Sequence, residues 1–456
     1  MVELDTNFAT AAADGNAALT FEKVSLHADA ITANRVTGDV VAVGHLALTQ
    51  DGRRLQGDHL QYNFHRDEGV LANARVVEQG VIVRGEVIEF SPDRLVARQA
   101  SFTTCTKETP DYSLSADTIT LTAGGTDRRG RPVSGRFALS RARINYHGRR
   151  LFSLPNYSIP VGRIQQRQAS LIPTTGFSRG DGLYTSWTSS FSRPTSATSA
   201  DLNLRLTTAR GWRGRLQVIR PSDPFDLFAG YTRREEVRET ELHEDQFTFS
   251  TADVLVDRAP ECGVKVLDLP VRHSLRLRGD LRYGSYTEFD AESGEELQSA
   301  NRFAVSALLE TGKYPISPAV ALSGAAGLRL STYSTDDRFR IGFFRGTVAF
   351  TRSEDNRLSL SYIHRPTSGQ SPFLFDAVEV RRELLGDLRY RLSPAWRMRV
   401  LEAYDLDEGR VRDLSLSVTR TVHCLDYMLG WKQLSRSVFF AINLAPMPEG
   451  EASVLP

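Results

Sequence analysis

The chain has 456 residues, with 56 basic and 55 acidic side chains and a formal net charge of +1. This length predicts at least two domains, and the balanced charge lacks the basic excess typical of nucleic-acid-binding proteins. No run of 18 apolar residues occurs, which argues against a transmembrane helix. The start of the chain lacks the basic and apolar regions of a signal peptide, so none is predicted there.

A short pattern that ends in an acidic residue occurs four times in the first quarter of the chain. The acids are Asp29, Asp58, Glu86 and Asp117, at intervals of 29, 28 and 31 residues. A fixed period of this size indicates one supersecondary unit stacked on copies of itself. A single acid in each unit, at a turn or strand edge, indicates a solvated or backbone-bonding position more than a metal ligand.

Within each unit the hydrophobic period is 2, which predicts strands. In the first copy Leu26 and Ala28 alternate with polar neighbours, a turn follows at 37–39, and a β-branched run begins at Val40. Stacked β units predict a solenoid or an open β jelly roll with an apolar interior. We place a disordered segment at residues 1–20 and this β jelly roll at 21–165.

After about residue 170 the repeat is replaced by about 14 to 16 longer alternating segments. Many reach the roughly 9–11 residues that a strand needs to cross a bilayer, and their polar side carries many charges. The segment Ser437–Leu444 is aromatic and aliphatic, as expected where a barrel closes. A soluble sandwich also alternates, but these features favour an all-β chain with an antiparallel transmembrane β-barrel at 166–447 and a tail at 448–456.

Four short elements, taken in order, carry a resemblance to a known family. They are Ser101–Cys105 (SFTTC), Pro110–Ala116 (PDYSLSA), Leu154–Pro160 (LPNYSIP) and Leu171–Pro173 (LIP). Followed by a barrel-like half, they resemble the LPS-assembly protein LptD family, also called OstA or organic solvent tolerance protein. The resemblance covers residues about 20 to 190, and it returns around Cys424.

The resemblance implies an outer-membrane translocon for lipopolysaccharide, or a related glycolipid, and no enzyme. A periplasmic jelly roll would receive the lipid from an LptA-like bridge protein, and the barrel would insert it into the outer leaflet through a lateral opening. An LptE-like lipoprotein is the plug partner of the family. No cofactor, metal or nucleic acid is implied.

The apolar face of the predicted jelly roll offers a path for acyl chains. Each methylene that leaves water is stabilised by about 0.8 kcal/mol, so an amphiphile needs a continuous apolar trough. The alternative is that these side chains only fill the domain's own core. The candidate path residues are Leu46, Leu48, Leu60, Val76 and Ile119.

Three prolines, Pro155, Pro160 and Pro173, flank the predicted first barrel strands. Proline donates no hydrogen bond to a β ladder, so these residues would weaken the seam and form a lateral gate. The alternative is a rigid linker between two domains. On the gate hypothesis, Pro173→Ala is expected to tighten the seam and slow lipid export.

In the family, disulfides join the periplasmic domain to the end of the barrel, which implies a Cys105–Cys424 disulfide here. The chain departs from the family in lacking an extreme N-terminal cysteine and a second C-terminal one. Cys262 then has no assigned role, and Pro260 beside it indicates a loop. The predicted barrel is also smaller than the family's, which bears on whether a plug fits inside.

Two other functions remain to be distinguished. A general outer-membrane porin or export channel with a periplasmic β domain would share the same pattern. A soluble bridge protein would not need residues 180–445. For an enzyme, the common serine hydrolase, zinc protease and phosphate-loop motifs are missing from the sequence.

Overall fold

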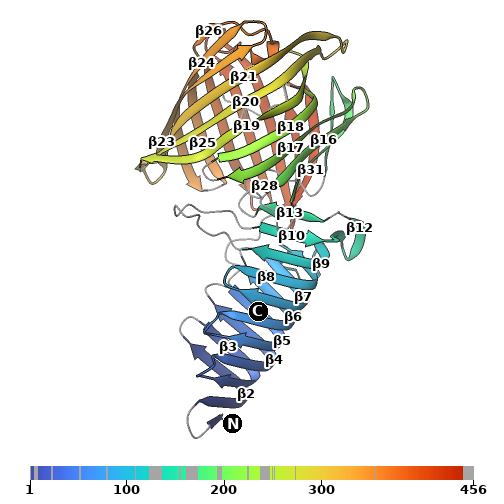
Figure 1. The fold of residues 1–456 in the computed structure, drawn as a ribbon, viewed down its shortest axis with the longest axis vertical. Helices are drawn as coiled ribbons and strands as arrows, with labels where there is room; N and C mark the ends of the chain where they lie inside the picture. Colours follow the sequence, from blue (N-terminus) through green and yellow to red (C-terminus); the bar gives the residue numbers. More distant parts are fainter. Residues whose placement is uncertain are drawn as a thin grey trace.

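The protein consists of an elongated β-sheet followed by a closed β-barrel (Figure 1). It is seen in a computed structural model that describes residues 2–4, 9–21, 24–50, 53–78, 81–107, 109–122, 136–153, 156–160, 173–192, 198–222, 225–236, 247–248, 250, 252–272, 274–353 and 355–444. Within these ranges no helix has the length and hydropathy needed to cross a membrane.

The first unit is an antiparallel sheet of 13 strands, most of which pair with their neighbours in sequence. This sequential order shows a curved meander, and it does not show the crossed connections by which a jelly roll is usually recognised. The strands are β1 (Val2–Leu4), β2 (Thr10–Phe21), β3 (Val24–Asn34), β4 (Asp39–Gln50), β5 (Arg53–Asn63), β6 (Glu68–Glu78), β7 (Val81–Ser91), β8 (Arg94–Thr103), β9 (Tyr112–Thr122), β10 (Arg136–Ser140), β11 (Arg143–Tyr146), β12 (Arg149–Ser153) and β13 (Tyr157–Pro160).

The strands of the sheet bend where their pairing is interrupted. The pairing of β3 with β4 breaks between His27 and Ala30, and that of β4 with β5 breaks between Val43 and Leu46. His45 at this break has a positive φ of 40°. Interruptions of this kind bend a strand and increase its twist. Both halves of each bent strand therefore turn their apolar side chains into one interior.

The N-terminal segment corrects the expectation of disorder at residues 1–20. Residues 10–20 belong to β2, which pairs with β3 from Thr10 opposite Asn34 to Phe21 opposite Val24. The first repeat would otherwise expose the unpaired backbone groups of an edge strand, and β2 satisfies them. This strand was not predicted because its small alanines give only a weak alternation of apolar and polar side chains.

The second unit is a closed antiparallel barrel, as predicted. The short β22 and β26 continue the lines of β21 and β25 along their partners β23 and β24. Because β21 pairs directly with β23 and β25 with β27, the wall has 16 strands. The strands are β14 (Thr174–Ser178), β15 (Gly182–Ser192), β16 (Ser199–Thr207), β17 (Gly211–Ser222), β18 (Phe225–Glu236), β19 (Val254–Arg272), β20 (Leu275–Asp290), β21 (Glu296–Thr311), β22 (Tyr314–Ser317), β23 (Val320–Tyr333), β24 (Arg338–Ser353), β25 (Asn356–His364), β26 (Thr367–Gly369), β27 (Arg382–Ser393), β28 (Trp396–Asp405), β29 (Arg410–Val422), β30 (Leu425–Lys432) and β31 (Ser437–Leu444).

The outer face of the barrel is apolar and its inner face is polar. In β20, Leu281 and Tyr283 are 40% and 50% exposed, whereas Tyr286 and Glu288 on the opposite face are 1% exposed. An apolar band on the outside of a closed barrel is typical of strands that face lipid. Other large apolar side chains exposed on wall strands include Trp212, Tyr231, Phe344, Tyr362, Tyr390 and Trp431.

A segment between β26 and β27 folds into the barrel at the end distant from the sheet. It contains a 3-10 helix, η2 (Leu374–Asp376), whose first two backbone N–H groups donate to the Glu288 carboxylate at 3.0 and 2.8 Å. The Asp376 carboxylate accepts hydrogen bonds from Arg302 at 2.7 Å and from the Tyr333 hydroxyl at 2.5 Å. This segment therefore fills part of the lumen.

Candidate functional site at the junction of sheet and barrel

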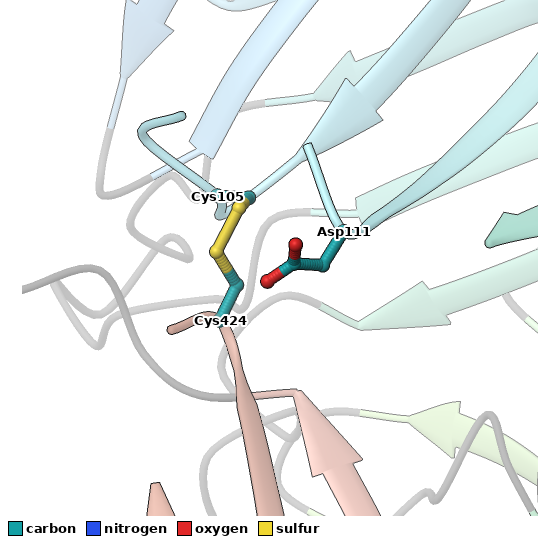
Figure 2. Close-up of side chains that lie close together, drawn as sticks. All are labelled: Cys105, Asp111 and Cys424. Atoms are coloured by element: carbon teal, nitrogen blue, oxygen red, sulfur yellow. A yellow bond between two sulfur atoms is a disulfide. The ribbon is translucent and has the colours of Figure 1, made fainter. Parts of the chain in front are cut away.

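A disulfide joins the two units where they meet. Cys105 follows β8, and Cys424 lies in the short turn between β29 and β30. The two residues are 319 apart in the sequence, and their Cα atoms are 5.1 Å apart (Figure 2). The expected Cys105–Cys424 pairing is confirmed.

Hydrogen bonds within the SFTTC and PDYSLSA elements fix the position of Cys105. The Thr103 hydroxyl donates to the Tyr112 carbonyl at 2.7 Å and accepts from the Cys105 backbone N–H at 3.0 Å. The Thr104 backbone N–H donates to the Tyr112 hydroxyl at 3.1 Å. Burial raises the pKa of that hydroxyl. The two elements thus form one rigid base for the disulfide.

Charged side chains surround the disulfide, and the sequence had suggested no role for them. The Asp111 side chain is 7% exposed and points toward the sulfur atoms (Figure 2). Its carboxylate lies 3.0 Å from Lys107 Nζ and 3.2 Å from His423 Nδ1. The His147 backbone N–H donates to the Asp111 carbonyl at 2.8 Å. These residues come from three separate segments of the chain and become neighbours only in the folded protein.

The five candidate path residues all lie in the apolar interior of the sheet. Each is 2% exposed or less, and all belong to one buried cluster. This cluster continues past Cys105 into the barrel, where it includes Leu425 and packs against Phe191, Tyr427 and Ile442. The path residues are Leu46 and Leu48 in β4, Leu60 in β5, Val76 in β6 and Ile119 in β9.

The apolar cluster ends beside the strands that close the barrel. First strand β14 pairs with last strand β31 over four residue pairs, from Thr175 opposite Phe440 to Ser178 opposite Ser437. The adjoining pairings have eight residue pairs between β30 and β31 and five between β14 and β15. Within the part of the chain that the structure describes, Ala441–Leu444 at the end of β31 pair with β30 and not with β14.

The three prolines of the expected gate occupy different places. Pro155 lies outside the described residues. Pro160 ends β13 and stands opposite Arg136 of β10, so it belongs to the sheet and not to the barrel wall. Pro173 is half-buried and directly precedes β14. Of the two described prolines, Pro173 is the one that adjoins the closing strands.

The acids of the repeat stabilise bends of the sheet. The Asp58 carboxylate accepts a hydrogen bond from Asn73 at 2.9 Å, and Asn73 has a positive φ of 48°. Asp117 forms an ion pair with Arg141, whose φ is also positive. Among the residues that the structure describes, none of the repeat acids belongs to a cluster able to hold a metal. Asp58 and Asp117 thus have structural partners among the described side chains.

Cys262 lies in strand β19, which corrects the expected loop. It is exposed on the outer face and stands opposite Tyr283 of β20. Pro260 indicated a loop, but the pairing of β19 with β20 is interrupted between Arg258 and Glu261, where proline is tolerated.

Comparison with known proteins supports the resemblance seen in the sequence. No family model matches the chain. LptD of Acinetobacter baylyi, an LPS-assembly protein, is 25% identical over 174 residues, which are 37% of this chain and 20% of that protein. LptD of Cupriavidus necator is 26% identical over 173 residues, with the same coverage. The similarity to LptD is confirmed over about a third of the chain.

The match spans about a fifth of the length of these LptD relatives. Among solved structures, CdiB from Acinetobacter baumannii has a TM-score of 0.36 at 11% identity, over 60% of this chain and 58% of that one. A Rhodopseudomonas blastica porin has a TM-score of 0.30 at 9% identity, over 59% and 95%. Both scores are low. The LptD relatives and the apolar outer band of the barrel support a place in a bacterial outer membrane.

Proposed function

We propose that the protein is an outer-membrane translocon that accepts lipopolysaccharide, or a related glycolipid, on its periplasmic sheet and releases it sideways through the β14–β31 closure. One observation carries this proposal. The apolar interior of the sheet continues past Cys105 to Phe191 and Ile442, on strands next to that closure.

The physical argument follows the acyl chains. They are excluded from water in the periplasm, so they move along a surface that is apolar throughout. In the described state, side chains such as Leu48 and Leu60 pack against one another. A lipid would separate the two halves of the bent sheet and take the place of these contacts, as in the open β jelly roll of the family.

Among the described residues, the closure has the fewest residue pairs of the wall, four against the five that join β14 to β15. Pro173, directly before β14, has no N–H with which to extend them. Opening the closure breaks few backbone hydrogen bonds and leads directly into the lipid bilayer. The Pro173→Ala variant supplies one more donor, so it is expected to slow export.

The partners follow from the same resemblance. An LptA-like bridge protein would add its strands to the N-terminal edge of the sheet, at β1 and β2. An LptE-like plug would have to share the lumen with the segment around Leu374–Asp376, which leaves less room for it.

A disulfide lock across the closure tests the proposal. Thr175 and Phe440 stand opposite one another, so Thr175→Cys with Phe440→Cys is expected to cross-link and to stop the appearance of lipopolysaccharide at the cell surface. The matched control joins Thr188 to Asn203, between β15 and β16. Normal surface lipopolysaccharide with the closure fully cross-linked would refute lateral release.

The alternative is a porin or export channel, because the barrel has a polar interior. A photoreactive residue at Leu60 distinguishes the two, since a translocon predicts cross-links to lipopolysaccharide there. The control position is Gln61, the exposed next residue on the other face. A porin predicts no lipid cross-link at either position and steady passage of small solutes into vesicles.

A further inference from the structure

A positive charge already sits between two side chains that are common metal ligands. Lys107 Nζ lies 2.7 Å from His423 Nδ1 and 3.0 Å from an oxygen of Asp111. In the tautomer of His423 that carries its proton on Nε2, the Nδ1 atom accepts from this ammonium group. In that tautomer the imidazole and the carboxylate both direct lone pairs toward one cation.

Two sulfur atoms lie next to this pair. One carboxylate oxygen of Asp111 and the sulfur atoms of Cys105 and Cys424 all lie within 4.8 Å of one another (Figure 2). On the other side of the carboxylate, Asp111 Oδ2 lies 3.2 Å from His423 Nδ1. In a tetrahedral zinc site with bonds of about 2.0–2.3 Å, the ligand atoms lie about 3.3–3.8 Å from one another. The group within 4.8 Å does not include His423, so its imidazole would have to rotate toward the sulfur atoms, once these are no longer bonded, to complete the tetrahedron.

We propose that, when the disulfide is reduced, Cys105, Cys424, Asp111 and His423 bind one zinc ion. A trialkylphosphine reduces the disulfide with one water, which yields two thiols and the phosphine oxide. Zinc then replaces the two thiol protons, which pass to solvent, and binds neutral His423 and ionised Asp111.

The charges of such a site are balanced by the residue that zinc displaces. Two thiolates and one carboxylate against Zn²⁺ leave a net charge of −1, and the ammonium of Lys107 supplies +1 nearby. All three anionic ligands are buried, whereas the His423 side chain is 57% exposed and would bind from the solvent side. The site would hold the sheet against the barrel in chains that lack the disulfide, independently of what the barrel transports.

Cobalt and zinc titration of the full-length protein in detergent tests the proposal. A Cys262→Ser background leaves Cys105 and Cys424 as the only cysteines. After reduction without oxygen and removal of the phosphine, one Co²⁺ per chain is expected, with a sulfur-to-cobalt charge-transfer band that Zn²⁺ abolishes. The oxidised protein is expected to show no such band.

Two variants assign the other ligands. His423→Asn and Asp111→Asn are each expected to weaken binding by about 10-fold or more. His423 has a positive φ of 55°, which asparagine tolerates, so the first variant keeps the turn even if the second disturbs folding. His45→Asn, at a bend of β4 with a positive φ of 40°, is the matched control and should bind as the parent does. Parental affinity in His423→Asn, or no charge-transfer band in the reduced parent, would overturn the site.

Discussion

The imidazole of His45 lies 2.9 Å from the carboxylate of Asp29, and this pair joins the bends of two neighbouring strands in the sheet. The two residues are 16 apart in the sequence, and Asp58 with Asn73 repeats the arrangement one unit later. A short polar side chain on one strand thus holds the left-handed backbone of the next. This contact gives the acids of the first two repeats, Asp29 and Asp58, a structural role.

The Asp29–His45 pair predicts a pH-dependent stability of the β3–β4 bend. The hydrogen bond to Asp29 raises the pKa of His45. A histidine whose pKa is raised by folding stabilises the folded state fully at pH values below its pKa in the unfolded chain, about 6.5. This stabilisation is lost as the pH rises through the pKa in the folded state. Hydrogen-exchange protection of β3–β4 peptides, corrected for intrinsic rates, should therefore fall as the pH rises above about 6.5.

The control for this prediction is His45→Asn. Asparagine accepts the positive φ and bonds to the acid without a charge, as Asn73 does to Asp58. Its protection should stay constant over the same pH range. Equal pH dependence in the parent and in this variant would exclude His45 as the titrating group.

Loss of the interdomain disulfide is expected to destabilise the docking of sheet and barrel. For a loop of 319 residues, the chain-entropy model gives an upper figure of roughly 5–6 kcal/mol. In the Cys105→Ser variant, the sheet should therefore become sensitive to added protease at lower denaturant concentrations than in the parent. Cys262→Ser, which removes an exposed thiol, is the control. A parent that migrates identically on reducing and non-reducing gels would contradict the bond itself.

A methyl group at Gly176 is expected to loosen the barrel closure. Its Cβ would lie 2.5 Å from the Val438 carbonyl oxygen of β31 and 2.6 Å from the Tyr184 ring. Forced contacts of this kind cost about 1–3 kcal/mol. The temperature at which the folded band disappears in a heat-modifiability gel should fall in Gly176→Ala.

Gly346→Ala in β24 is the matched control, because its Cβ would meet no atom within 4 Å. Its gel transition should equal that of the parent or lie slightly higher, since alanine restricts the unfolded chain. If both variants lose the folded band at the same temperature as the parent, the close contact across the seam is not strained.

The luminal segment is expected to restrict the passage of solutes. Asp376→Ala removes the carboxylate that holds η2 to Arg302 and Tyr333, leaving the buried guanidinium without this partner. The segment should detach, and vesicles that contain the variant should swell faster in small sugars than those with the parent. The control is Asp336→Asn in the exposed β23–β24 turn, because asparagine tolerates the positive φ of 65° there. Rapid swelling with the unaltered protein would instead favour the porin alternative.

Most of the architecture was predictable because its signal is local. Alternation and turns between strands predicted an all-β chain, a stacked first unit and a barrel of up to 16 strands. The N-terminal strand β2 was missed because small alanines give little hydrophobic contrast. Cys262 was assigned to a loop because the sequence does not show where the pairing of two strands is interrupted. That interruption, between Arg258 and Glu261, depends on the neighbouring strand β20.

The junction was only partly predictable. The cysteine pair came from the family resemblance and was confirmed. Asp111, Lys107 and His423 gave no signal, since two of them lie more than 300 residues apart and only folding makes them neighbours. The luminal position of Asp376 likewise depends on the path of a long loop, which alternation does not determine.

The covalent connections at the junction restrict how the barrel could open. The disulfide ties one side of the β14–β31 closure to the sheet through Cys424, which directly precedes β30, the strand that pairs with β31. The end of β31 nearest the sheet is thus held in place through β30. If the closure opens as proposed, β31 would move away from β14 mainly at the opposite end of the barrel, and the bending of that strand would limit the width of the opening.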